Sequence, residues 1–217
     1  LSYLVIACFR RQFSYYSNNS IKRVHMRKYL LHVLIISFVF LLAPTAQVVS
    51  YAGAIEDAKE EVRKNPDDAM AHFKLGVAYG ESGKYEEAIE SHKQAIRIDP
   101  DAAIAHVGLG AACLKSGMHK EAIESYKQAI KVDPDFALAH NGLGIAYGYL
   151  GKYEEAIESY KQAIRIDPDD ATAHYGLGVT YIILRDKSSA LKQHKILKKL
   201  DTKMAKELLG MIYTELD

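Results

Sequence analysis

Cysteine is scarce in this sequence of 217 residues, which contains only Cys8 and Cys113. Cys8 lies in an N-terminal stretch that we expect to be removed, so Cys113 has no second cysteine with which to form an internal disulfide. The other repeats described below have tyrosine at the corresponding place. We therefore interpret Cys113 as a small buried apolar residue rather than as a reactive thiol.

Catalytic and cofactor-binding motifs are missing as well. The sequence has no H-E-x-x-H zinc motif, no glycine-rich phosphate loop and no G-x-S-x-G nucleophile motif. The G-L-G segments at residues 108–110 and 142–144 lie inside predicted helices, whereas a dinucleotide-binding turn follows a strand. We predict a protein that is not an enzyme and needs no cofactor.

Acidic residues are absent from residues 1–54, which carry six lysines and arginines. The remaining residues carry 22 lysines and arginines against 27 aspartates and glutamates. A mildly acidic body of this kind has no basic stripe that could neutralise phosphates, so we expect no nucleic-acid partner.

Residues 26–54 have the order that is typical of a secretory signal peptide. Met26 begins a short basic segment, residues 30–43 are almost entirely apolar, and small residues follow. This segment of fourteen residues is shorter than the ~20 residues that a membrane-spanning helix needs. We expect cleavage after Ala52 or Ala54 and a body that is exported, which places it in the periplasm if the source is bacterial.

Two alternatives for the N-terminus stay open. Residues 1–25 resemble no part of the body, and we interpret them as upstream sequence before a start at Met26, but residues 1–28 also have the composition of an organelle transit peptide. In the second alternative, residues 30–43 stay uncleaved as an anchor, with Arg27 and Lys28 on the cytoplasmic side. We expect membrane contact only if this segment is retained.

The main feature of the body is a repeat of 34 residues. The segment KYEEAIESYKQAIRIDPDD at residues 152–170 matches KYEEAIESHKQAIRIDPDA at residues 84–102, and a third version lies midway at residues 118–136. Self-similarity at a fixed period predicts a solenoid, in which each unit buries its apolar face against the next.

Each repeat predicts two helices. Apolar residues recur with helical spacing over residues 69–82, which end before Gly83, and over residues 85–98, which end before Asp99 and Pro100. Small residues such as Gly76 and Ala88 would let the helices approach closely. The repeat is therefore a helical hairpin.

The pattern resembles the tetratricopeptide repeat family, which has an aromatic residue, Leu-Gly and a second aromatic residue in the first helix, and Ala, an aromatic residue, Ala and Pro later. The third unit shows it as His140, Leu143, Gly144, Tyr147, Ala156, Tyr160, Ala163 and Pro168. The resemblance implies an all-α, right-handed superhelical solenoid of helix-turn-helix hairpins that binds other proteins.

Four units are predicted, at residues 67–100, 101–134, 135–168 and 169–202. The last is degenerate, because Arg185, Leu197 and Thr202 replace the motif's glycine, alanine and proline. A half-repeat helix at residues 55–66 and a capping helix at residues 203–217 are expected at the two ends, since terminal repeats have only one neighbour.

Four histidines recur with the same period: His72, His106, His140 and His174. Equivalent positions in stacked units lie ~8–10 Å apart, whereas zinc ligands lie ~2.0–2.1 Å from one shared ion. We therefore interpret the histidines as packing residues in place of the family's aromatic residue, and we expect no metal.

The first helix of each unit has one face whose residues are not needed for packing within the repeat. Superhelical stacking would make this face concave, and its residues are largely apolar. We predict that it binds a protein or peptide ligand such as an amphipathic helix. The predicted partner groove consists of Met70, Phe73, Val77, Ile104, Val107, Ala111, Leu114, Leu138, Asn141, Ile145, Tyr149, Tyr175, Val179 and Ile182.

Some family members hold a partner's terminal carboxylate with Lys and Asn on this face. Here Asn141 is the only polar residue of the groove and Lys115 lies at its rim, so that clamp is not expected. The predicted function is an exported adaptor or scaffold. The alternatives are a membrane-anchored assembly factor and a self-associating protein, whose groove is filled by the capping helix or by a second copy in a homodimer.

Overall fold

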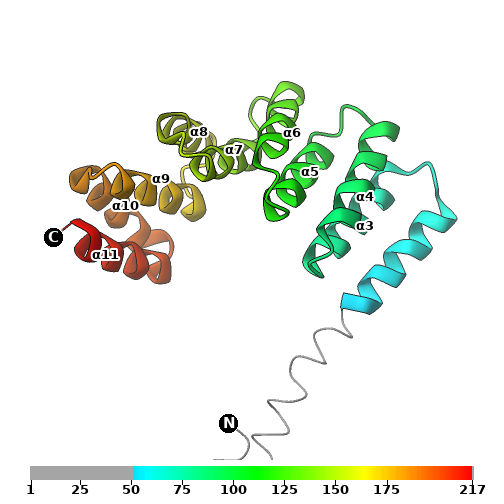
Figure 1. The fold of residues 1–217 in the computed structure, drawn as a ribbon, viewed down its shortest axis with the longest axis horizontal. Coiled ribbons are helices and arrows are strands. Elements are labelled where there is room, and N and C mark those ends of the chain that lie inside the picture. The colour runs from blue at the N-terminus through cyan, green and yellow to red at the C-terminus, as the bar shows by residue number, and fades with distance from the viewer. Residues whose placement is uncertain (1–50, 217) are drawn as a thin grey trace, which may run out of the picture. The chain divides into compact units, whose positions relative to one another are not determined.

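The computed structural model describes residues 51–216, and this part of the chain is helical (Figure 1). The predicted leader at residues 1–25 and the signal peptide up to residue 50 lie outside the described residues. A helix covers residues 51–64. It is followed by α3 (Ala69–Glu81), α4 (Tyr85–Ile98), α5 (Ala103–Lys115), α6 (His119–Val132), α7 (Ala137–Tyr149), α8 (Tyr153–Ile166), α9 (Ala171–Ile183), α10 (Lys187–Leu200) and α11 (Thr202–Leu216).

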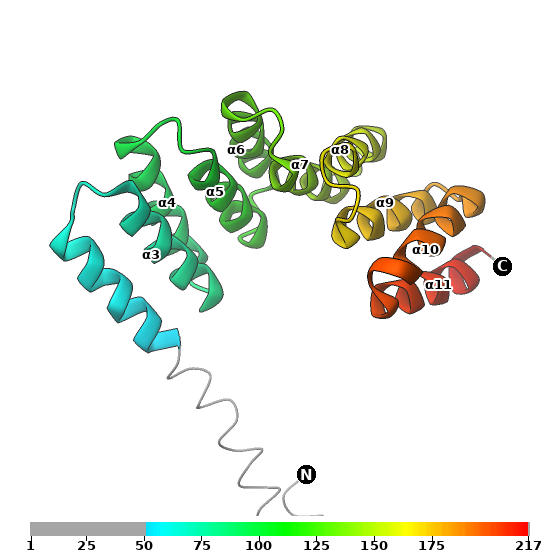
Figure 2. The same cartoon turned by 180° about the vertical axis from the view of Figure 1, so that it is seen from behind.

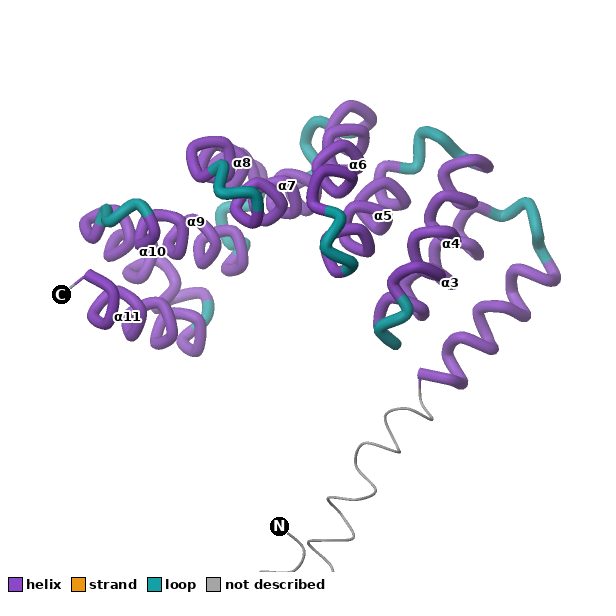
Figure 3. Tube along the Cα trace, in the orientation of Figure 1, coloured by secondary structure: helices purple, strands orange, loops and turns teal. Residues whose placement is uncertain are grey.

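Consecutive helices form hairpins that stack into a helical solenoid. The pairs α3–α4, α5–α6, α7–α8 and α9–α10 fall within the four predicted units, and the second helix of each pair packs against the first helix of the next. First helices also contact each other, as α5 does with α3 and α7. Figures 2 and 3 show this succession from behind and as a tube, with short connections at the helix ends.

The turn inside each hairpin requires a backbone conformation that favours glycine. Gly83, Gly117 and Gly151 have φ angles of 79°, 80° and 72°. Arg185 occupies the same place in the fourth unit with φ 59°, and it is the only non-glycine residue with positive φ in the described part of the chain. A side chain in this left-handed region costs about 1–2 kcal/mol.

One aromatic side chain from the second helix of a unit packs between the first helix of that unit and the first helix of the next. Tyr126 of α6 lies between Gly110 of α5 and Gly142 of α7, where added Cβ atoms would be 2.8 and 2.4 Å from the phenol ring. His92 lies in the same way between Gly76 and Gly108. Because these glycines have no side chain, they allow the close helix approach that the sequence predicts.

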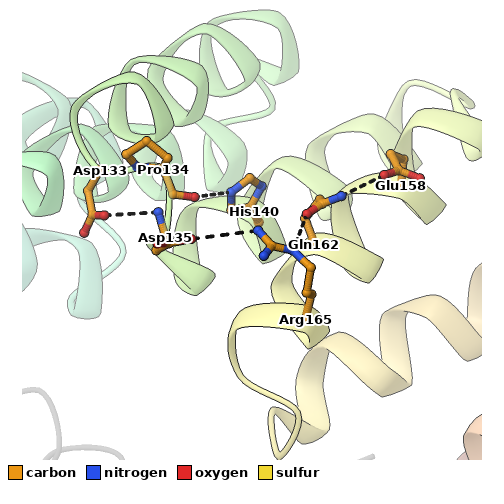
Figure 4. Close-up of polar contacts among 7 residues, drawn as sticks. All are labelled: Asp133, Pro134, Asp135, His140, Glu158, Gln162 and Arg165. Carbon is orange, nitrogen blue, oxygen red and sulfur yellow. Dashed lines mark hydrogen bonds and ion pairs between the residues drawn. The ribbon is translucent and has the colours of Figure 1, made fainter.

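The repeated histidines fix the connections between units. The Nε2 atom of His140 donates a hydrogen bond to the carbonyl oxygen of Pro134 at 2.9 Å, and His72, His106 and His174 make the same contact with the preceding repeat proline at 2.9 to 3.0 Å. Figure 4 shows the third of these connections, in which the backbone N–H of Asp135 donates to Asp133 at 3.1 Å. The histidines therefore hold the turn, a role that the packing interpretation missed.

The same connection is linked to the following helix. Arg165 of α8 forms an ion pair with Asp135 at 3.8 Å, and its Nε atom donates to Gln162, which in turn donates to Glu158 (Figure 4). These exposed polar contacts run along the outer surface of the third unit. Exposed pairs of this kind contribute about 0–1 kcal/mol each, so most of the stability must come from the apolar packing.

Helices cover both ends of the stack of repeats. At the N-terminal end, Ile55 and Ala58 pack against Leu75 and Ala78, and the helix is continuous through the predicted half-repeat boundary at residue 55. At the C-terminal end, α11 packs against both α9 and α10. It thereby takes the place that the first helix of a fifth unit would occupy.

The C-terminal helix buries the centre of its apolar face. Leu208 and Ile212 of α11 are 0% exposed and join Leu197 of α10 in one cluster. The contact between α11 and α9 is close at Gly178, where an added Cβ would lie 2.6 Å from the Leu208 side chain.

Cys113 is buried as expected, and burial raises the pKa of its thiol.

Candidate protein-binding face

The predicted groove residues that the structure leaves accessible lie on α3, α5 and α7. On α7, Leu138, Ile145 and Tyr149 are 59%, 36% and 66% exposed. The α7 sequence ALAHNGLGIAYGY contains no charged residue. A helix with this composition presents solvent with an apolar surface that has no ionic groups to keep it hydrated.

The aromatic residue at the end of this surface is held in place. The Tyr149 ring stacks on His119 of α6, with ring centroids 4.8 Å apart and planes 11° from parallel. The stack leaves Tyr149 largely exposed, so the ring is fixed without being covered. Fixing a side chain before binding lowers the entropy lost when a partner docks.

The other two helices contribute smaller accessible patches. On α3, Met70 and Val77 are 48% and 38% exposed, while Phe73 is half-buried with its ring 5.4 Å from His92. On α5, Ala111 is exposed, Ile104 is half-buried, and Val107 and Leu114 pack partly against the core. We call the accessible apolar residues of α3, α5 and α7 the inner face: Met70, Phe73, Val77, Ile104, Val107, Ala111, Leu114, Leu138, Ile145 and Tyr149.

Asn141 does not belong to the inner face, which corrects the predicted groove. It is 6% exposed, and its amide Nδ2 donates to Asp170 at 3.2 Å and to Thr172 at 2.7 Å. Asp170 also caps α9 by accepting from the N–H groups of Thr172 and Ala173. Asn141 thus ties the third unit to the start of the fourth.

In the α9 part of the predicted groove, Ile182 is wrong, whereas Tyr175 and Val179 are half-buried. Ile182 is 4% exposed, and Tyr175 and Val179 pack against the cluster formed with α11. The Tyr175 hydroxyl lies 3.8 Å from the Sδ atom of Met211. The capping helix therefore packs against the α9 end of the predicted groove.

The three first helices of the inner face carry few charged residues: Lys74 and Glu81 on α3 and Lys115 on α5. Lys74 of α3 forms an ion pair with Glu61 at 2.6 Å, and this carboxylate raises the pKa of the lysine.

Within residues 51–216, no group of three or more His, Cys, Asp and Glu residues is placed to hold a metal ion. Over the same residues, no helix combines the length and hydropathy needed to cross a membrane.

Sequence reasoning missed a second group of exposed apolar residues. It comprises hairpin-turn residues and residues of the terminal unit, with exposed fractions of 36 to 56%: Met118, Leu150, Ile183, Leu184, Leu191, Ile196 and Tyr213. The available signal was in the fourth unit, where Ile196 stands at the position of Gln94, Gln128 and Gln162, and Leu184 at the position of Ser82 and Ser116.

Comparison with protein families identifies the class. A model described as TPR repeat matches residues 79–117, 112–151 and 149–182, and a model described as tetratricopeptide repeat matches residues 58–90. The chain belongs to the tetratricopeptide repeat family. No curated protein matches the chain.

Solved structures agree with this assignment. The crystal structure of MamA is 30% identical, with a TM-score of 0.63 over 72% of this chain and 91% of that chain. TTC0263, a thermophilic TPR protein in Thermus thermophilus, is 22% identical, with a TM-score of 0.66 over 81% and 97%. YrrB, a TPR protein with an unusual peptide-binding site, is 21% identical, with a TM-score of 0.59 over 81% and 90%.

Proposed function

We propose that this protein is an exported adaptor that binds a protein or peptide through the inner face. The observation that carries the proposal is the surface of α7, which lacks charge and leaves Leu138, Ile145 and Tyr149 exposed. Soluble proteins seldom leave a contiguous apolar surface without a partner. Covering it would contribute about 25 cal/mol for each Å² of apolar area removed from water.

The shape of the surface favours an elongated ligand. The three first helices stand side by side, each contacting the next, so their exposed apolar residues form rows that run across the stack. An amphipathic helix or an extended apolar segment matches such rows. YrrB, with its peptide-binding site, is a case in which this fold presents a site of that class.

Export is the second part of the proposal, and it rests on the sequence of residues 26–54. Its basic, apolar and small-residue segments have the order of a signal peptide. Cleavage after Ala52 would leave Ile55 within the helix, where it packs against Leu75 and Ala78. N-terminal sequencing of the mature protein tests this. A mature chain that begins between residues 53 and 55 supports export, and a mature chain that begins at Met26 supports the anchored alternative.

A site-specific cross-linking experiment tests the partner site. Replacing Tyr149 with the photo-reactive amino acid p-benzoylphenylalanine keeps an aromatic ring at an exposed position of the inner face. Tyr213 is the matched control, because it is also an exposed tyrosine, at 56% against 66%, but lies on α11. We expect irradiation in native cells to give a discrete protein adduct from residue 149 and none from residue 213.

A second pair of variants distinguishes ligand binding from self-association. Ile145→Asp places a charge on the inner face, and Val132→Asp places one on an equally exposed valine of α6, since the two side chains are 36% and 37% exposed. Loss of the residue-149 adduct with Ile145→Asp alone supports the proposal. An adduct consisting of two copies of this chain would assign the inner face to a homodimer and contradict the adaptor function.

A further inference from the structure

The second helix of the last unit, α10, has a surface chemistry unlike that of the other units. Its sequence KSSALKQHKILKKL contains five lysines and no acidic residue, whereas α8 contains three glutamates with one lysine and one arginine. At the positions of those glutamates, α10 has Ser188, Ser189 and Lys192. The fold does not require this change, since α8 and α10 pair with their first helices in the same way.

The lysines lie on the outer side of α10. Ala190 and Leu197 are 0% exposed and define the buried side. Lys192, Lys195 and Lys199 are exposed and are spaced three and four residues apart, which places them in one row along the opposite side. The row spans ~10 Å, about half of a 14-residue helix that is ~21 Å long.

Asp186, which caps α10, is the one acidic residue of residues 183–200, and hydrogen bonds from Ser189, with a smaller contribution from Lys192, lower the pKa of its carboxyl group. In the part of the chain that the structure describes, Lys192, Lys195, Lys198 and Lys199 form no ion pair, although lysines at equivalent or nearby positions elsewhere do, such as Lys127 with Glu124. Like charges at these spacings destabilise a helix. An anionic ligand would remove that repulsion.

Apolar side chains border the row on both sides and at its start. Leu191 and Ile196 are 36% and 38% exposed, and Ile183 at the end of α9 and Leu184 in the following turn are 50% and 41% exposed. The exposed Arg185 follows them in its left-handed conformation. Aliphatic side chains next to lysines are typical of proteins that lie on a lipid surface, where the lysine stems also contact the apolar region.

We propose that α10 and the turn before it, residues 183–200, dock this protein on an anionic phospholipid surface. Five lysines and Arg185 against the single acidic residue Asp186 match the negative potential of such a surface, and the four exposed Leu and Ile side chains match the boundary between its headgroups and acyl chains. Nucleic acid has no apolar region to receive these aliphatic side chains, and the one ring of α10, His194, is half-buried with its Nδ1 atom 3.0 Å from the carbonyl oxygen of Ala205, so α10 offers no free ring on which a base could stack.

The proposal stands apart from the proposed adaptor function. It uses only residues 183–200, whereas the inner face lies on α3, α5 and α7, so one can fail without the other. It also differs from anchoring by residues 30–43, because it needs no spanning segment. A protein held by α10 would keep its inner face free for a partner.

Site-resolved lysine labelling on the full chain tests the proposal. Acetylation of each lysine is followed by mass spectrometry, with no vesicles, with neutral phosphatidylcholine vesicles, and with vesicles of phosphatidylcholine and phosphatidylglycerol. We expect Lys192, Lys195 and Lys199 to react several-fold more slowly on the anionic vesicles alone. Lys93, Lys127 and Lys161, the lysines that precede Lys195 at the repeat period of 34 residues, are the internal controls and should keep their rates.

Three outcomes would overturn the proposal. Equal protection of both lysine sets, or protection of neither, would show that α10 does not face the lipid. Protection by neutral vesicles as strong as by anionic ones would remove the role of the lysines. Protection that grows with protein concentration without vesicles would assign α10 to contact with a second copy of the chain.

Variants give a second measurement by vesicle co-sedimentation. Replacing Lys192, Lys195 and Lys199 with Gln should lower partitioning onto anionic vesicles about 100-fold, since each lysine near such a surface contributes about fivefold. The matched Gln variant of Lys93, Lys127 and Lys161 removes the same charge and should stay within about twofold. Ile196→Gln, which introduces the residue that α8 has at position 162, should weaken binding without affecting the fold. Equal losses for the two triple variants would contradict docking through α10.

Discussion

The Nε2 atom of His140 lies 2.9 Å from the carbonyl oxygen of Pro134, six residues earlier in the chain. The contact joins the first helix of the third unit to the turn that ends the second unit. It recurs at each connection between described units with nearly the same distance. A side chain at the position of the family's aromatic residue therefore has both a packing role and a hydrogen-bonding role.

Removing the hydrogen bond alone should lower stability. His140→Phe keeps a ring of similar size but leaves the Pro134 carbonyl without its donor. We expect the free energy of unfolding to fall by about 1 kcal/mol, the usual net contribution of one hydrogen bond, as measured by urea denaturation. His119→Phe is the control, since that ring stacks on Tyr149 and its Nδ1 atom is buried without a partner. A loss in the control equal to that of His140→Phe would contradict the role assigned to the Pro134 contact.

Two glycines of α7 should respond in opposite ways to the same substitution. In Gly142→Ala the new Cβ would lie 2.4 Å from the Tyr126 ring, so we expect a loss of about 1–3 kcal/mol from overpacking. In Gly148→Ala the Cβ meets nothing within 4 Å, and the higher helix propensity of alanine should add about 0.5–1 kcal/mol. Thermal unfolding of the two variants checks the signs. A similar change in both would mean that Tyr126 can move away.

The period and helix-breaking residues predict most of the fold. The expected helices at residues 69–82 and 85–98 compare with Ala69–Glu81 and Tyr85–Ile98 in the structure, because Gly83 and Pro100 mark their ends. Burial of Ile182 was not predictable in the same way. It depends on α11, which follows no repeat pattern and packs where another first helix would lie.

Dependence on contacts with a neighbouring helix also explains the other errors at the candidate site. Asn141 was placed in the groove from its position on the helix, but its burial depends on Asp170 and Thr172 in the next unit. The lysines of α10 were overlooked because exposed charges on a helix are usually a solvated face. Their significance appears only when α10 is compared with α8 at equivalent positions in a known stack.

The arginine in the last hairpin turn should be replaceable with a gain in stability. Arg185 has φ 59°, and the corresponding residues of the other units are glycines. Arg185→Gly should raise the free energy of unfolding by about 1 kcal/mol because glycine adopts this conformation without steric cost. Gly151→Arg is the reciprocal control and should lower it by a similar amount. Unchanged urea midpoints in both variants would show that the turn relaxes to another conformation.

The buried histidine of the first unit should make stability depend on pH. His92 is 3% exposed, its Nδ1 atom has no hydrogen-bond partner, and burial lowers its pKa to about 4. The unfolded chain, with an ordinary pKa of about 6.5, therefore binds a proton before the folded chain does. Stability should be unaffected by His92 above about pH 6.5 and should fall as the pH is lowered toward about 4, by about 3 kcal/mol in total.

Aromatic variants of His92 isolate this effect from the titration of surface carboxylates. Tyr126 and Tyr160 occupy the equivalent position in the next two units, so His92→Tyr and His92→Phe place a familiar ring between Gly76 and Gly108. Urea denaturation at pH 7, 5.5 and 4 should show that the variants gain stability relative to the original chain as the pH falls, because they have no proton to bind. If the difference in stability between the variants and the original chain stays constant across this range, the His92 ring is hydrated or hydrogen-bonded in the folded protein. The packing between the first two units would then be looser than the structure indicates.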